Sequence, residues 1–221
     1  MVQIIVLAAV AFFLFWRLRS VLGSRQGFEK LNKDVNEKTK SSKINANTDD
    51  KIIDLKSTNI DEEIADYVDE NSEQFKTLSE LKKLEDGWQV SHFVSGAKLA
   101  YEEILMAFEN GDLSKIKKLS SKDVFTAFKE VIDDRNQKGL QVEAIFGGVR
   151  DIRIKDVKLN KKNLEANITM IFQCDITYSI KDKNDKIIEG GPDKVKKQKD
   201  VWTFTRKMNS DIPNWYLTKT E

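Results

Sequence analysis

Four side chains in this sequence have the chemistry for proton transfer: His92, Tyr101, Asp175 and Asp200. A carboxylate beside a tyrosine or histidine can act as a general acid or base if the two groups lie within hydrogen-bond reach. No spacing in the sequence forces two carboxylates together. His92 falls near the start of an expected helix, which favours a surface or capping role. Asp175 lies on the polar side of an alternating strand, so we expect it to be exposed. Asp200 is expected to pair with Arg206 or a neighbouring strand. The sequence therefore predicts no catalytic residues and a protein that is not an enzyme.

Composition excludes several other kinds of site. The 221 residues include 37 basic and 36 acidic side chains, with His92 as the single histidine and Cys174 as the single cysteine. One cysteine excludes a disulfide framework and a multi-cysteine zinc site, and one histidine excludes two-histidine metal motifs. A formal net charge of +1 argues against a dedicated DNA-binding protein. We therefore expect neither a metal nor a cofactor.

Lysine clusters and buried aromatic residues are the remaining candidates for binding. Lysines gather at positions 115–122 and 194–199 and could contact the phosphates of lipid or RNA, although no interleaved aromatic residues support single-strand binding. Trp202, Phe204 and Trp215 are expected in the core, with the lining of a pocket as the alternative.

The elements that must position these residues begin with a predicted membrane anchor at residues 1–22. Met1 to Trp16 carry no charge, and a helix extended to Leu22 would be about 33 Å long, enough to span a bilayer. A secretory signal carries its positive charge before the apolar run, whereas here the arginines follow it. The alternative is a hydrophobic helix packed on the domain. The anchor residues are Ile4, Ile5, Val6, Leu7, Phe12, Phe13, Leu14, Phe15, Trp16, Arg17 and Arg19.

The arginines after the apolar run also predict the orientation. Positive charge stays on the cytoplasmic side, so a single-pass protein would place its N-terminus outside and its C-terminal domain in the cytoplasm. Residues 23–60 are polar and lack a regular apolar period, which predicts a disordered basic linker. Its basic residues could rest on lipid headgroups, or it could be a solvated tether.

Charge reverses at residues 61–86, which hold ten acidic and three basic residues. Apolar residues recur there at helical spacing, so we expect an acidic amphipathic helical segment. An anionic membrane would repel an acidic face, so the segment is either a solvated surface or a surface for a protein partner.

Residues 87–221 read as one domain of helices followed by strands. An apolar stripe runs from Val90 to Phe108, Asp112 can cap a short second helix, and the sequence SSKD at residues 120–123 opens a third helix that ends at Gly139. We then expect strands at residues 140–146 and 152–159, and a long alternating strand over residues 164–180. A return strand starts at residues 187–188 and is broken at residues 190–192, and residues 201–206 and 215–220 form a hairpin.

The long strand predicts a curved sheet. Seventeen extended residues would span about 56 Å, too long for a flat strand in so small a domain. The strand must therefore bend or carry a bulge. The predicted fold class is α+β, with helices packed on a strongly curved antiparallel sheet that forms a cone.

Four short segments of residues 87–221 resemble the Tim44-like domain family, that of the mitochondrial inner-membrane import adaptor, which also occurs in bacteria. The segments read SGAKLAYE (95–102), AFENGD (107–112), DVWTFTR (200–206) and DIPNWYL (211–217), and Arg135 lies where the family has a comparable arginine. The residues that carry the likeness, and that could line a pocket, are Gly96, Ala97, Tyr101, Phe108, Gly111, Asp112, Arg135, Asp200, Trp202, Phe204, Arg206, Pro213 and Trp215.

The resemblance implies a nuclear-transport-factor-two-like cone and a non-enzymatic adaptor at an inner membrane. The mitochondrial adaptor docks a heat-shock-seventy-type chaperone to an import channel, so the expected partner is a chaperone or translocation machinery. An N-terminal anchor in place of a transit peptide is similar to the bacterial branch, which places the protein in a bacterial inner membrane. Two alternatives stay open: a cone that binds an apolar ligand or lipid, and docking to the ribosome or RNA.

Overall fold

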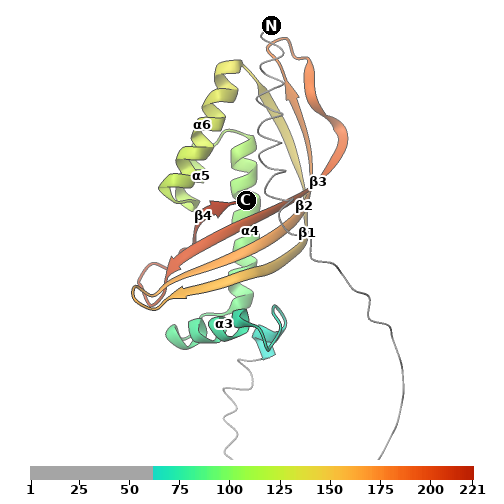
Figure 1. Ribbon diagram of the computed structural model, residues 1–221. Coiled ribbons are helices and arrows are strands. Elements are labelled where there is room, and N and C mark those ends of the chain that lie inside the picture. Colours follow the sequence, from blue (N-terminus) through green and yellow to red (C-terminus); the bar gives the residue numbers. More distant parts are fainter. Residues whose placement is uncertain (1–61) are drawn as a thin grey trace, which may run out of the picture. The chain divides into compact units, whose positions relative to one another are not determined.

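The computed structural model describes residues 62–221 (Figure 1). The predicted anchor at residues 1–22 and linker at residues 23–60 lie outside these residues. No helix in the described range is both long enough and apolar enough to cross a membrane.

A short helical turn at residues 62–65 opens the described range, and the helices α3 (Glu73–Leu84), α4 (Val90–Glu109), α5 (Leu113–Leu119) and α6 (Lys122–Lys138) follow it before the sheet. The caps of α5 and α6 are those that the sequence predicts. The Asp112 carboxylate accepts hydrogen bonds from two backbone amides at the start of α5, and the Ser121 hydroxyl accepts one at the start of α6. Gly139 ends α6 with φ of 64°, a left-handed conformation that glycine adopts without strain.

Four strands follow: β1 (Gln141–Asn160), β2 (Glu165–Lys181), β3 (Ile187–Lys207) and β4 (Tyr216–Thr220). They form one antiparallel sheet in the order β1-β2-β3-β4, which curves around the helices (Figure 1). Helices packed on an antiparallel sheet confirm the α+β class. The predicted long strand is β2, and the predicted C-terminal hairpin is the β3–β4 pair.

The first half of the sheet corrects one expectation. Instead of two strands at residues 140–146 and 152–159, β1 is a single strand that pairs with β2 along nearly its whole length. Three register shifts interrupt this pairing, the first between Phe146 and Gly148. Each shift inserts a residue without ending the strand, and such bulges bend a sheet. The residues between the two expected strands are therefore part of one bulged strand.

A second correction concerns residues 190–192, where we expected β3 to break. The strand continues through Gly190, Gly191 and Pro192, with a shift in its pairing to β2 between Thr177 and Ser179. A side chain at Gly190 would place its Cβ 2.1 Å from the Tyr178 carbonyl oxygen, and φ there is +75°. Glycine is therefore required where the two backbones approach each other.

The main core lies between α4 and one face of the sheet. Alternate residues of β2 from Ala166 to Ile176 are buried against α4, where Tyr101 is fully buried. Ile64, Leu78 and Leu81 from the acidic segment are also fully buried in this core. The apolar side of that segment therefore packs on the sheet domain, whereas most of its acidic residues are exposed.

Candidate functional site

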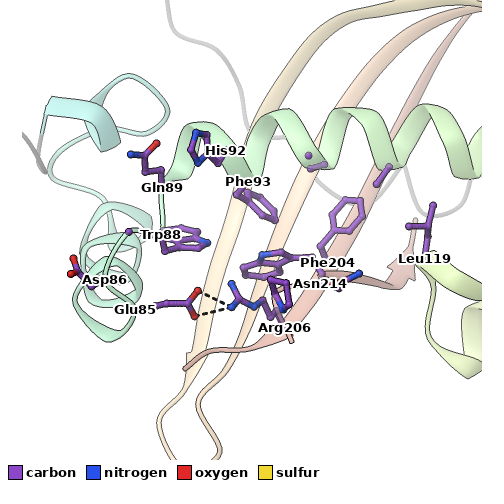
Figure 2. Close-up of a pocket in the computed structure, with 16 residues that line it drawn as sticks. Glu85, Asp86, Trp88, Gln89, His92, Phe93, Leu119, Phe204, Arg206 and Asn214 are labelled. Carbon is purple, nitrogen blue, oxygen red and sulfur yellow. Dashed lines mark hydrogen bonds and ion pairs between the residues drawn. The ribbon is translucent and has the colours of Figure 1, made fainter. Parts of the chain in front are cut away.

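A groove of about 470 Å³ opens where the start of α4 faces the connection between β3 and β4 (Figure 2). Its walls come from the residues just before α4, the first three turns of α4, the end of β3 and the segment at residues 213–215. The residues that line it include Trp88, His92, Phe93, Gly96, Ala100 and Trp215.

One wall of the groove is aromatic. The rings of Phe93 and Trp215 meet at a centroid distance of 4.7 Å in an edge-to-face arrangement, and Trp88 lies 6.5 Å from Trp215. The Phe204 ring lies edge-to-face to Phe93 at a centroid distance of 6.3 Å. Trp88 and Phe93 are buried whereas Trp215 is half-buried. Rings held in this way offer an apolar surface of fixed shape, so these side chains lose little conformational entropy when a ligand binds.

The opposite wall is a strip of small residues on α4. Gly96, Ala97 and Ala100 face the groove along successive turns of the helix. A Cβ at Gly96 would meet nothing within 4 Å, so open space begins directly at the helix backbone. The small side chains therefore keep the groove open beside the aromatic wall.

An ion pair closes the bottom of the groove. Arg206 Nη2 donates to both carboxylate oxygens of Glu85, at 2.7 and 2.9 Å, and Figure 2 shows these bonds beneath Trp88. Arg206 Nε also donates to the Ile212 carbonyl oxygen at 3.2 Å, and the backbone N–H of Asn209 donates to Glu85 Oε2 at 3.1 Å. The pair thus fixes the connection that carries Trp215. Arg206 also borders a second cavity of about 610 Å³, which residues 210–212 of this connection line as well.

The groove lies at the end of an acidic stretch. Residues 62–86 hold nine acidic and three basic side chains, ending with Glu85 and Asp86 at the groove itself. Burial opposes the ionisation of Glu63, but hydrogen bonds from Lys82 and Ser91 outweigh this effect and keep its pKa below the usual value. Lys82 and Arg206 neutralise Glu63 and Glu85, so it is the other carboxylates of this stretch, Asp86 at the groove among them, that favour a cationic ligand next to the aromatic wall.

A second polar cluster lies inside the core, where we considered proton-transfer chemistry. Tyr101 on α4 donates its hydroxyl hydrogen bond to Asp200 Oδ2 at 2.6 Å, and Gln198 Nε2 donates to the same oxygen at 2.7 Å. Cys174 Sγ lies 3.1 Å from the Tyr101 hydroxyl. Asp200 therefore pairs with a helix residue and a residue of its own strand, whereas the expected partner Arg206 binds Glu85.

The chemistry of this buried cluster favours a structural role. Burial, together with the nearby Asp200 carboxylate, raises the pKa of Tyr101 far above its usual value. Burial likewise raises the pKa of the Cys174 thiol. Both groups therefore stay protonated at neutral pH, and neither of the two cavities described above is lined by Tyr101, Cys174 or Asp200. The cluster therefore supplies hydrogen-bond donors to the buried Asp200 carboxylate in the core.

The other two candidates for proton transfer lie apart from this cluster. His92 is exposed on the third residue of α4 and lines the groove. We expected Asp175 to be exposed, and this prediction is wrong. Its side chain is only 17% exposed and forms a 2.5 Å ion pair with Arg150. Pairing across the bulged β1–β2 ladder covers this carboxylate.

The family comparison matches residues 74–221 to the Tim44-like domain. The chain belongs to the Tim44-like domain family. No curated protein sequence matches it. Among solved structures, the intermembrane space region of the chloroplast protein ARC6 is 9% identical, with 58% of this chain and 94% of that chain covered and a TM-score of 0.41. A de novo designed beta-sheet protein is 15% identical, with 60% and 88% covered and a TM-score of 0.24. These two structural likenesses are too weak to support any argument about function.

The motif residues of this Tim44-like domain lie in three places. Those at the groove are Gly96, Ala97, Phe204, Arg206, Pro213 and Trp215. Those in and around the buried polar cluster are Tyr101, Trp202 and Asp200, where the Trp202 ring packs 4.7 Å from Tyr101. Those at the far end of α4 are Phe108, Gly111, Asp112 and Arg135, where Arg135 lies 4.3 Å above the Phe108 ring and pairs with Glu109.

Sequence reasoning did not select Glu85 or Trp88, which line the groove from outside the recognised motifs. Trp88 directly follows Gly87 and precedes α4. A large aromatic residue next to a glycine at a helix start could have marked a contact point, but Glu85 gave no such signal because its partner Arg206 is 121 residues away.

Proposed function

We propose that this Tim44-like domain is a non-enzymatic adaptor that binds a segment of a protein partner in the groove at the start of α4. In this proposal residues 1–22 hold the domain at the cytoplasmic face of a bacterial inner membrane. The partner is a component of chaperone, translocation or assembly machinery. Tethering supplies a high effective concentration, so the groove needs only moderate intrinsic affinity.

The aromatic wall opposite Gly96 is the observation that carries the proposal. Binding energy at protein interfaces concentrates in a few aromatic and arginine residues that form well-packed pockets. Here Trp88, Phe93 and Trp215 form such a wall around open space. An apolar side chain of a partner would enter between this wall and the α4 backbone.

The charge around the groove indicates the sign of charge that a partner segment should carry. The acidic stretch at residues 62–86 ends at the groove, so a basic partner segment is favoured over an acidic one. The segment that fits best is amphipathic, with one bulky apolar residue and lysine or arginine beside it.

The test uses a photoreactive residue at position 96 in the full chain, in native membranes. Gly96 has room for a side chain, and Ser95 is an exposed neighbour on the same helix that does not line the groove. We expect a protein adduct from position 96 that position 95 does not give, mapped to a basic segment with an apolar anchor. A synthetic copy of that segment should bind the purified full chain, and Gly96→Arg should abolish binding whereas Ser95→Arg should not.

Deletion of residues 1–22 separates tethering from recognition. The shortened chain should keep its affinity for the synthetic segment and lose capture of the partner in membranes. Equal adducts from positions 95 and 96, or adducts to RNA, would contradict the adaptor proposal.

A second candidate function is the binding of a small apolar ligand, which the size of the groove favours. Small-molecule sites commonly measure about 300–1,000 Å³, and the groove falls in this range at about 470 Å³. In this case the adduct from position 96 would be a lipid or metabolite, and its yield would not depend on residues 1–22.

A further inference from the structure

The upper part of β3 is an open edge of the sheet (Figure 1). β2 pairs with β3 along one side, whereas β4 pairs on the other side only with Trp202–Thr205. Within the described part of the chain, no strand pairs with that side of β3 from Ile187 to Val201. An open edge presents unpaired backbone amide and carbonyl groups that another strand can bind.

This edge is strongly basic. Residues 194–199 contain four lysines, and Lys194, Lys197 and Lys199 are exposed. These three form no ion pair among residues 62–221. Asp175 lies across the ladder from Lys197, but its carboxylate is paired with Arg150. Lysines on an edge strand oppose pairing with neutral or basic strands. The same charges favour a strand that carries acidic side chains.

The pairing register shows which side chains an added strand would meet. Lys196, Gln198 and Asp200 lie opposite buried residues of β2, so Val195, Lys197 and Lys199 share the outer face. On this face Ile145, Thr177 and Val195 form a row across three strands. Ile145 and Val195 are 71% and 64% exposed. An apolar residue opposite Val195 would extend this row onto a fifth strand.

We propose that residues Lys194–Val201 of β3 bind an extended acidic segment of a partner protein as an added antiparallel strand. Antiparallel pairing places the partner's residues in the order acidic, any, acidic, any, β-branched apolar, opposite Lys199, Lys197 and Val195. Backbone hydrogen bonds give affinity, and the two charge pairs with the apolar contact give the register. This surface is separate from the groove and takes the opposite charge, so the proposal stands independently of the proposed function.

The experiment measures binding of fluorescent peptides to the full chain in a neutral detergent by anisotropy. The probe is acetyl-TETETVT-amide, and a lysine copy, TKTKTVT, has the opposite charge. A third peptide keeps every side chain of the acidic probe but is N-methylated at four consecutive amides, which removes the donors that strand pairing needs. We expect the acidic probe to bind about tenfold or more tightly than either control, from the usual size of cross-strand pairs.

Matched protein variants locate the site. The double variant Lys197→Glu and Lys199→Glu should weaken the acidic probe about tenfold and improve binding of TKTKTVT. The second effect shows that the variant is folded. Lys117→Glu with Lys118→Glu makes the same charge change at two exposed positions of α5 and should leave both affinities unchanged.

Three outcomes overturn the proposal. The first is equal binding of the N-methylated and unmodified acidic peptides, which would leave charge alone as the cause. The second is equal loss in the two double variants. The third is displacement of the probe by anionic phospholipid vesicles, together with insensitivity to N-methylation, which would assign the edge to a membrane surface.

Discussion

The ion pair between Glu85 and Arg206 makes the sharpest prediction about stability. The Arg206 side chain is 6% exposed and the Glu85 side chain 25% exposed, so the two partners are buried unequally. Removing one partner of a buried pair typically costs about 3–5 kcal/mol, because the remaining charge stays uncompensated. The cost should therefore depend on which charge is left behind.

We expect Glu85→Gln to lower the free energy of unfolding by about 3 kcal/mol, since it leaves the more buried guanidinium without a counter-charge. Arg206→Met should cost less, about 2 kcal/mol, because water and the Asn209 amide still reach the Glu85 carboxylate. The double variant should lose about 3 kcal/mol, less than the sum of the single losses. The coupling energy is then about 2 kcal/mol, within the range seen for residues in one network.

The assay is urea unfolding of the full chain, followed by tryptophan fluorescence, with all four proteins of the cycle at two salt concentrations. Trp88 and Trp215 lie beside the pair and report its environment. The control cycle is Glu80→Gln with Lys161→Met, an ion pair at 3.0 Å whose side chains are 45% and 74% exposed. Exposed pairs contribute at most about 1 kcal/mol and are screened by salt. A coupling for Glu85 and Arg206 that is no larger than the control, or equally sensitive to salt, would refute the reasoning.

Three further predictions test other parts of the fold. The pKa of Glu63 is depressed in the folded state, so its contact with Lys82 stabilises above its usual pKa near 4.5 and is lost as pH falls. Glu63→Gln should therefore destabilise by about 1 kcal/mol at pH 7 and progressively less in acid, measured by urea unfolding across pH. Gly190→Ala should cost more than about 2 kcal/mol by clash and strain, whereas Gly96→Ala in open helix should stabilise by about 0.5–1 kcal/mol, as thermal unfolding will show. Cys174, 1% exposed and with its pKa raised by burial, should react with a thiol reagent only at the rate of unfolding.

Local rules predicted the helices well. Asp112, Ser121 and Gly139 act as caps because a cap depends only on residues three or four positions away. The alternation of β2 was equally readable, since one face of the strand is buried from Ala166 to Ile176. The sequence therefore predicted the α+β class and the long strand.

The same local rules do not distinguish a glycine in a bulged strand from a glycine in a turn. Gly148 and Gly190 have positive φ, which normally indicates a turn, yet both lie inside paired strands. A bulge and a turn need the same backbone freedom, and only the partner strand decides between them. Asp175 was misjudged for a similar reason, because its cover comes from Arg150 on a neighbouring bulged strand.

The groove depends on contacts that no local pattern contains. The recognised segments at residues 95–102 and 211–217 are distant in sequence, and each lines a different wall. Arg206 ties the second segment to the chain before α4, because it binds both Glu85 and the Ile212 carbonyl oxygen. Because this one side chain fixes the connection that carries Trp215, loss of the ion pair should disorder the aromatic wall while α4 and the sheet still hold the core. Partner binding should therefore fail in Arg206→Met at urea concentrations where the domain remains folded, which links the stability cycle directly to the function of the groove.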